Sequence, residues 1–250
     1  AGLLLENIRY EPGETKDDPV VARKIREMAD LFVCDAFGNV HRAHASLCAA
    51  AKLFPQAAAG FLLEKEVEYL QGRLGNPERP YAAFLGGAKV SDKIPILQSM
   101  SEKVDALCIG GAMAYTFLAA TGLTSGNSLV EPGLVTRCAE ILDAAKERGV
   151  RVLLPADHVA APAIDEEKNI STVSADAFPD GLSAFDIGPE TTRAYSAVAA
   201  ASRTIFWNGP MGVWENELFE SGSKKIAHSV ADSRAFSIIG GGDTIACVNH

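Results

Sequence analysis

The chain has 250 residues, 48% of them hydrophobic and 22% charged, with a formal net charge of −9. This composition is typical of a globular chain that can bury a sizeable core in one large or two smaller domains. The negative balance argues against wholesale binding to nucleic acid or to an anionic membrane, whereas a small anionic ligand requires only local positive charge.

Short apolar runs alternate with helical patterns along the whole sequence. The runs predict buried strands at residues 3–8, 31–35, 81–85, 104–109, 150–154, 204–207 and 236–239. Between two of them, residues 134–148 predict an amphipathic helix that ends at Gly149, with one apolar face formed by Val135, Cys138, Ile141, Leu142 and Ala145. Such alternation indicates an α/β fold with a mostly parallel sheet covered by helices.

The domain organisation follows from one helix and from the two chain ends. Residues 61–74 predict a helix with an apolar stripe, followed by GNPERP, and we interpret it as a connector between a domain at 1–60 and another at 75–250. The sequence opens within an apolar run (AGLLLENIRY) and closes within the first turns of a predicted helix (GGGDTIACVNH). We therefore expect both ends to be truncated.

Two further features bear on the location of the protein. The five cysteines form no CxxC pair, which predicts reduced, buried thiols and a cytoplasmic protein rather than disulfides or zinc ligands. Residues 106–130 carry no formal charge, but Gly110-Gly111 and the polar residues 122–128 interrupt them. A buried strand, turn and helix is the interpretation we prefer to a membrane span.

Three glycine-rich turns follow predicted strands: Gly86-Gly87-Ala88-Lys89, Gly110-Gly111 and Gly240-Gly241-Gly242-Asp243-Thr244. In open α/β sheets, ligands bind at the carboxyl ends of strands, where free backbone N–H groups attract phosphate. Lys89 and Lys93 would share a helix face and reach one polyphosphate, while Asp243 and Thr244 would cap a helix and offer a carboxylate to magnesium. The alternative is that the glycines only ease packing and the lysines are solvated.

Common nucleotide motifs do not account for these turns. GGAKVSDK lacks the spacing of the P-loop, and no GxGxxG opens a βαβ unit, as an NAD-dependent dehydrogenase would require. Residues 35–38 and 41–42 are similar to the DFG and HRD motifs of protein kinases, but the residues and their order are wrong.

Two other stretches are candidates for binding. Arg9 and Arg42, which lies in the segment DAFGNVHRAHAS (residues 35–46), are arginines suited to binding phosphate or carboxylate. The same segment contains His41 and His44, but lone histidines at such positions are more often packing groups than ligand contacts. The segment FWNGPMGVWE (206–215) would form an apolar ledge for an aromatic base, with Glu215 as an acceptor for ribose hydroxyls, or else only a buried loop.

Taken together, the stretches LLENIRYEPGE, DAFGNVHRAHAS, GGAKVSDKI, GGAMAYTFL, FWNGPMGVWE and GGGDT resemble the phosphoglycerate kinase family, in its order and over almost the whole chain. The departures are small: Asn39-Val40 stands where Thr-Ala is frequent, and Trp214 where Phe is frequent. The resemblance implies two doubly wound α/β domains that close by a hinge, the first only partly present. It also implies a monomer without nucleic-acid or membrane partners.

The resemblance implies reversible phosphoryl transfer in glycolysis, between 1,3-bisphosphoglycerate and ADP, giving 3-phosphoglycerate and ATP with Mg²⁺. Triose phosphate would bind the remnant domain 1–60 through Arg9, Arg42 and His41, and nucleotide would bind residues 75–250. Catalytic roles fall to Lys89 and Gly242, and the metal to Asp243. The implied nucleotide-binding residues are Gly86, Gly87, Lys89, Lys93, Gly110, Gly111, Asn208, Pro210, Val213, Glu215, Gly240, Gly241, Gly242, Asp243 and Thr244.

The same resemblance implies that segments are missing. Family members carry an earlier part with an RVDFNVP-type strand and an HLGRP-type turn, and they continue past the present end. An alternative is therefore a truncated nucleotide-binding module without turnover.

Overall fold

The computed structural model describes residues 3–250 and divides into two compact units, Ala1–Asn76 and Pro77–His250. Each unit is described separately. Among the described residues, no helix is long and apolar enough to cross a membrane. All five cysteines are free; Cys108 and Cys138 are buried as predicted, but Cys34, Cys48 and Cys247 are only partly covered.

The first unit contains a two-stranded parallel sheet, in which β1 (Phe32–Cys34) pairs with β2 (Ala57–Ala59). Its helices are α1 (Pro19–Glu27), α2 (Ala50–Leu53), which continues a π-helical segment at Ala45–Ala49, and α3 (Phe61–Val67), which runs on as a π-helix over Glu68–Arg73. Short 3-10 turns lie at Ile8–Tyr10, Glu14–Lys16 and Phe37–Asn39. Asp18 caps α1 by accepting the Val20 N–H.

The strand predicted at 3–8 is wrong. Residues 3–7 have no regular structure, and Ile8 begins a 3-10 turn. Leu3 and Leu4 are 83% and 96% exposed, and no strand among the described residues pairs with this segment. Because a strand needs a neighbour for its backbone N–H and C=O groups, apolar sequence alone does not make one.

The second unit is built on a five-stranded parallel sheet with the order β10-β9-β3-β4-β5. Its strands are β3 (Tyr81–Leu85), β4 (Ala106–Ile109), β5 (Arg151–Leu153), β9 (Thr204–Asn208) and β10 (Phe236–Gly240). All five lie within a few residues of the predicted strands. The buried residues of β3, β4 and β9 explain why continuous apolar runs marked them.

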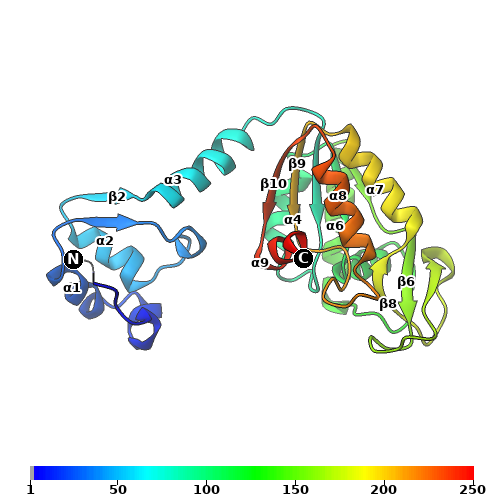
Figure 1. Cartoon of the computed structure of the whole chain (residues 1–250), viewed down its shortest axis with the longest axis horizontal. Coiled ribbons are helices and arrows are strands. Elements are labelled where there is room, and N and C mark those ends of the chain that lie inside the picture. The colour runs from blue at the N-terminus through cyan, green and yellow to red at the C-terminus, as the bar shows by residue number, and fades with distance from the viewer. Residues whose placement is uncertain (1–2) are drawn as a thin grey trace. The chain divides into compact units, whose positions relative to one another are not determined.

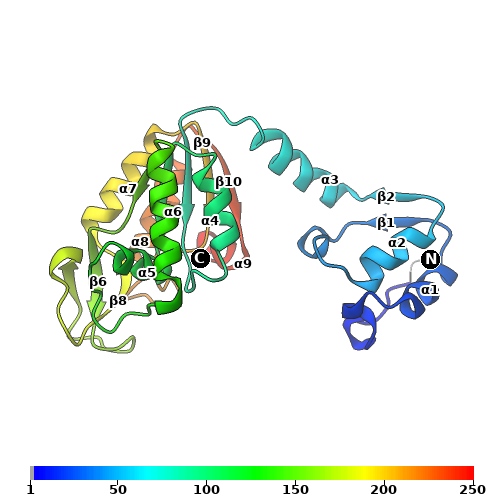
Figure 2. The ribbon, with the colours of Figure 1, turned by 180° about the vertical axis from the view of Figure 1, so that it is seen from behind.

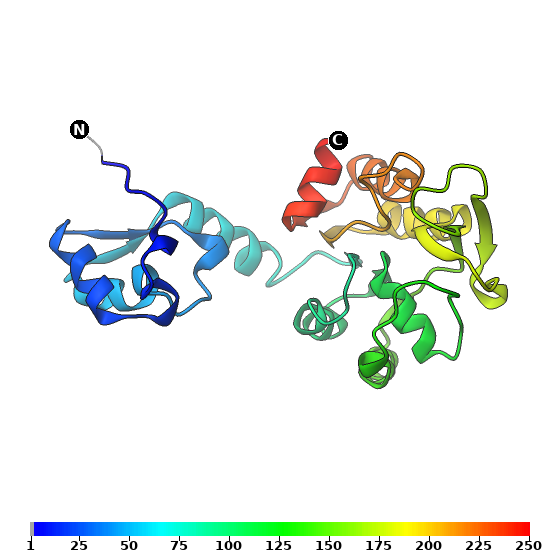
Figure 3. The same ribbon diagram turned by 90° about the horizontal axis from the view of Figure 1, so that it is seen from below.

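Helices cover both faces of this sheet, as Figures 1, 2 and 3 show. One face carries α4 (Ile94–Ser101), α5 (Met113–Ala120) and α6 (Val135–Glu147), and the other carries α7 (Pro189–Ala201), α8 (Ser221–Ala231) and α9 (Gly242–Asn249). The uncharged segment 106–130 forms β4 and α5. Helix α6 matches the helix predicted at 134–148 and buries Cys138, Ile141 and Ala145 of the predicted face.

An antiparallel sheet not predicted from sequence flanks the parallel one. It has the order β7-β6-β8 and consists of β6 (Asp157–Ala161), β7 (Ser171–Ser174) and β8 (Ser183–Ile187). Its core packs Val173 and Ala184 against Tyr115 and Leu118 of α5. This sheet supplies one wall of the site described next.

Candidate functional site

Four neighbouring strands of the parallel sheet end at one level. The register pairs Leu85 with both Ile109 and Asn208, and Asn208 with Gly240. The turns that follow these strands are therefore adjacent, as expected for the carboxyl edge of a parallel sheet. The edge brings the three predicted glycine-rich turns and the 208–215 loop together.

Backbone hydrogen bonds join these turns directly. Gly86 N–H donates to the Asn208 carbonyl (3.0 Å) and Gly87 N–H to the Pro210 carbonyl (3.1 Å). Gly111 N–H likewise donates to the Met211 carbonyl at 2.8 Å. A Cβ atom at Gly86 would lie 2.0 Å from the Pro210 oxygen, so only glycine allows the two main chains to approach this closely.

The turn at Gly240–Gly242 is joined to the 208–215 loop through side chains. Thr244 is fully buried, and its hydroxyl accepts the Gly209 N–H at 2.6 Å. Asn208 lies beneath Gly241, where a Cβ would be 3.3 Å from the asparagine Nδ2. The N-cap of α9 is Gly241, without a side-chain cap bond, so the predicted capping role of Asp243 and Thr244 is wrong. Thr244 instead ties α9 to the 208–215 loop.

Lysine and aspartate side chains lie near this junction. Lys93 Nζ donates to Asn208 Oδ1. Burial lowers the pKa of Lys93, against the charges of Asp243 and Asp92, which raise it. Asp243 is exposed in the first turn of α9, and Lys89 is also exposed. The prediction that Lys89 and Lys93 share a helix face is wrong, because α4 begins at Ile94 and the lysines lie in the turn before it.

A cavity of about 490 Å³ adjoins the turns. Its walls include the predicted residues Gly87, Gly111, Pro210, Val213, Glu215 and Asp243. Three more wall residues, Ala88, Gly212 and Trp214, belong to stretches that the sequence predicts as binding segments. The other wall residues were not predicted from sequence: Ala112, Tyr115, Asn127, Ser128, Leu129, Ile164, Ser183, Ala184 and Phe185. Six of these come from the antiparallel sheet and the 127–129 loop, which carry no glycine pattern. The wall is mainly apolar on one side and glycine-rich on the other, which suits a flat aromatic group attached to an anion.

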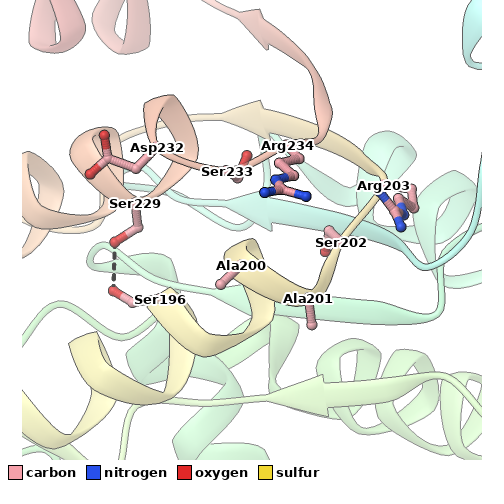
Figure 4. Close-up of a pocket in the computed structure, with 9 residues that line it drawn as sticks. All are labelled: Ser196, Ala200, Ala201, Ser202, Arg203, Ser229, Asp232, Ser233 and Arg234. Carbon is pink, nitrogen blue, oxygen red and sulfur yellow. Dashed lines mark hydrogen bonds between the residues drawn. The ribbon is translucent and has the colours of Figure 1, made fainter.

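A second hollow, of about 560 Å³, lies at the opposite edge of the sheet, where α7 and α8 end (Figure 4). Arg203 and Arg234 flank it, but helix carboxyl ends disfavour anions and attract cations, so these arginines complement the helix ends. The hydroxyls of Ser202, Ser229 and Ser233 donate to carbonyls of their own helices. We therefore place the candidate site at the carboxyl edge.

The described residues include no group of three or more His, Cys, Asp or Glu side chains arranged to hold a metal ion. A lone carboxylate such as that of Asp243 does not form a cage for a tightly bound metal. It does fit a magnesium ion that arrives with phosphate oxygens and keeps several waters.

Two of the predicted residues of the first unit contact Asn39. The Arg9 side chain donates to Oδ1 of Asn39 at 3.3 Å, and Asn39 lies three residues before Arg42 in the sequence. The side chains of Arg9, His41 and Arg42 are all exposed. His44 is buried with its Nδ1 3.8 Å from Glu14 Oε1, which is a packing role. The main-chain N–H of Arg42 donates to the Asn39 carbonyl at 2.9 Å, so both arginines contact Asn39.

Comparisons with known proteins agree with one another. The family model for phosphoglycerate kinase matches residues 1–250. The phosphoglycerate kinase of Anaeromyxobacter sp. (strain K) is 48% identical over 248 residues, covering 99% of this chain and 63% of the relative. The phosphoglycerate kinase of Moorella thermoacetica is 50% identical over 246 residues, which cover 98% of this chain and 62% of the relative.

Solved structures give the same result. Phosphoglycerate kinase from Coxiella burnetii superposes with a TM-score of 0.89 at 41% identity, covering 97% of this chain and 63% of that chain. Phosphoglycerate kinase from Pyrococcus horikoshii OT3 superposes with a TM-score of 0.85 at 31% identity, covering 98% of this chain and 64% of that chain. The chain therefore spans a little under two thirds of the length of the relatives it matches.

Proposed function

Because this chain belongs to the phosphoglycerate kinase family, we propose that its Pro77–His250 unit binds a magnesium nucleotide and that the protein serves reversible phosphoryl transfer between 1,3-bisphosphoglycerate and ADP. The reaction is a step of glycolysis and would take place in the cytoplasm. The observation that supports it most is the meeting of four strand ends, with joined glycine turns, Lys93 and Asp243, beside the apolar cavity.

The arrangement suggests how a nucleotide would lie. The adenine would enter the cavity between Val213 and the turns at Gly87 and Gly111, with Glu215 as an acceptor for ribose hydroxyls. The phosphates would then run toward the Gly240–Gly242 turn and Lys93. When nucleotide binds, a phosphate oxygen would replace Asn208 Oδ1 as the acceptor for the Lys93 ammonium group.

The chemistry needs charge and alignment rather than a protein nucleophile. The bond from the acyl carboxylate to phosphorus breaks while a β-phosphate oxygen of ADP forms the new bond in line. Lys89, which is exposed beside the cavity, would neutralise charge on the transferring phosphoryl, and the Gly242 N–H at the α9 amino terminus would add a donor. A magnesium ion held by Asp243 would neutralise phosphate charge when bound. In the first unit, Arg9, Arg42 and His41 would bind the triose phosphate.

Titration calorimetry with Mg·ADP tests the nucleotide site, with the wild type beside a Lys89→Ala, Asp243→Ala double variant. We expect saturable binding to the wild type and weaker binding to the variant. A wild type that is folded by circular dichroism but does not bind would contradict the proposal.

A second candidate is nucleotide binding without turnover, because the cavity and the joined glycine turns all lie within the Pro77–His250 unit. A coupled assay of ATP formation from 1,3-bisphosphoglycerate distinguishes the two. Binding with no detectable turnover would favour the module, and turnover would favour the enzyme.

A further inference from the structure

Glu131 connects two parts of the candidate site that are distant in sequence. Its carboxylate Oε2 accepts the main-chain N–H of Val90 at 2.6 Å and that of Ser91 at 3.2 Å. Its own N–H donates to the hydroxyl of Thr116 in α5 at 3.1 Å. Thr116 is buried, and α5 follows the Gly110-Gly111 turn. One residue therefore links the turn after β3 to the helix after β4.

The turn that Glu131 holds is the one that carries both lysines. Lys89 directly precedes Val90, whose side chain is fully buried. Lys93 N–H donates to the Val90 carbonyl at 2.8 Å, so Lys93 depends on the same short turn. A turn with four exposed or half-exposed residues around a single buried valine has few other restraints on its main chain.

A carboxylate that accepts two successive N–H groups is a strong restraint, because hydrogen bonds to a charged acceptor are stronger than neutral ones. Desolvation raises the pKa of this carboxyl, but the hydrogen bonds from Ser91 and Val90 and the charge of Lys89 outweigh it, and the pKa of Glu131 lies below its usual value. The ionised form that accepts both N–H groups is thus the form present at neutral pH.

We propose that Glu131 is a positioning residue for the lysine-bearing turn: by accepting the Val90 and Ser91 N–H groups, it fixes the direction in which Lys89 and Lys93 leave the main chain toward a nucleotide's phosphates. This inference rests on the proposed function and deepens it. Glu131 itself does not line the nucleotide cavity and would not touch the nucleoside.

The test compares Glu131→Ala, Glu131→Gln and a control, Glu147→Ala, which removes an exposed carboxylate at the end of α6. Affinities for Mg·ATP and for adenosine are measured by calorimetry or competition. We expect Glu131→Ala to weaken Mg·ATP binding about tenfold, since misplaced charges lose alignment. Adenosine binding should stay unchanged, because the cavity wall is intact, and this shows that the variant is folded. Glu131→Gln keeps an acceptor oxygen and should bind Mg·ATP within about twofold of the wild type.

Two results would overturn the inference. Wild-type affinity of Glu131→Ala for Mg·ATP would show that the turn needs no such restraint. Equal losses in the Ala and Gln variants would show that an acceptor oxygen at position 131 does not hold the turn.

Hydrogen exchange separates this inference from the proposed function. A folded wild type that binds neither adenosine nor Mg·ATP contradicts the proposed function, yet the Val90 and Ser91 amides still report on Glu131. They should exchange faster in Glu131→Ala than in Glu131→Gln, and equal rates would overturn the inference by themselves.

Discussion

His158 of β6 is buried between the rings of Tyr115 at 5.5 Å and Phe178 at 5.8 Å. Within residues 3–250, neither of its ring nitrogens has a hydrogen-bond partner. Burial lowers its pKa to about 4, against a small opposing effect of Asp157. The folded state thus holds a neutral imidazole where the unfolded chain would bind a proton below about pH 6.5. Acid should weaken the second unit through this residue.

We predict that His158→Phe removes this acid sensitivity. Because the pKa is depressed in the folded state, the stability that neutral His158 provides is fully present above about pH 6.5 and is lost as pH falls toward 4. The loss at pH 4.5 amounts to about 2 to 3 kcal/mol. Urea unfolding of the wild type and the variant at pH 7.5 and 4.5 measures the difference.

The wild type must be compared with the variant at each pH, because the titration of Asp186 changes the free energy of unfolding in the opposite direction. Burial raises the pKa of this carboxyl to about 7, so its protonation adds stability as pH falls from about 7 to 4. Subtracting the two proteins at each pH cancels that contribution. If the difference in free energy of unfolding is the same at both pH values, His158 does not titrate as argued.

Gly86 gives a second test at the scale of a single atom. An added Cβ would meet the Pro210 oxygen at 2.0 Å, a backbone atom that cannot rotate away. We predict that Gly86→Ala separates the β3 turn from the 208–215 loop and destabilises the second unit by about 3 kcal/mol. Gly133→Ala is the matched control, because a Cβ there meets nothing within 4 Å. Chemical denaturation should show a large shift for the first variant only; equal shifts would refute the steric argument.

Among the elements, α8 supports the 208–215 loop through one buried hydroxyl. Ser223 Oγ accepts the N–H of Met211 at 2.9 Å and that of Gly212 at 3.2 Å. Asp186 in turn accepts the Gly222 N–H at the start of α8 at 2.6 Å. The antiparallel sheet, through β8, thereby holds the helix that holds the loop.

We predict that Ser223→Ala leaves these two N–H groups unpaired and costs about 1 to 3 kcal/mol. Since the loop forms part of the cavity wall, adenosine affinity should fall as well. Ser229→Ala on the same helix removes a hydroxyl that hydrogen-bonds to Ser196 and to the Lys225 carbonyl, away from the cavity wall, and should leave adenosine affinity unchanged. Titrations of both variants decide: equal affinities would mean that the loop is held without Ser223.

The elements also show what sequence could and could not predict. The strands β3, β4 and β9 were recognisable because they are buried on both faces and read as continuous apolar runs. The strands β6, β7 and β8 were not, since Ser171–Ser174 is almost entirely polar and β6 begins with Asp157 and His158, which are buried only because of tertiary contacts. The strand predicted at 3–8 was wrong for the opposite reason: the segment is apolar, but no strand in the described part of the chain pairs with it.

The residues of the candidate site also fall into those that the sequence predicts and those that it does not. The glycine turns were predictable because close approach of main chains demands glycine, and that demand is visible in sequence. Glu131, Ser223 and the 127–129 wall act through contacts with residues that are ten to sixty positions away, so no local pattern marks them. Whether the predicted residues bind nucleotide stays a prediction.

For the whole molecule, the two units differ in how much core they bury. Within residues 3–76 the buried apolar side chains are Val21, Ala22, Ala45, Ala50 and Phe54. The second unit buries every residue of β3 and β4 and nearly all of β9. In the first unit, Leu3, Leu4 and Phe61 are more than 80% exposed. A small core gives little hydrophobic stabilisation, so the first unit should open at lower free energy than the second.

We therefore predict two separate responses to nucleotide. Calorimetry should resolve two transitions, with the lower one belonging to residues 3–76. Mg·ATP at about a hundred times its dissociation constant should stabilise the upper one by about 2.7 kcal/mol, because only the Pro77–His250 unit would bind it. Hydrogen exchange by mass spectrometry then locates the added protection. Protection spread over both units, or a single transition that shifts as a whole, would mean that the two units unfold together despite their unequal cores.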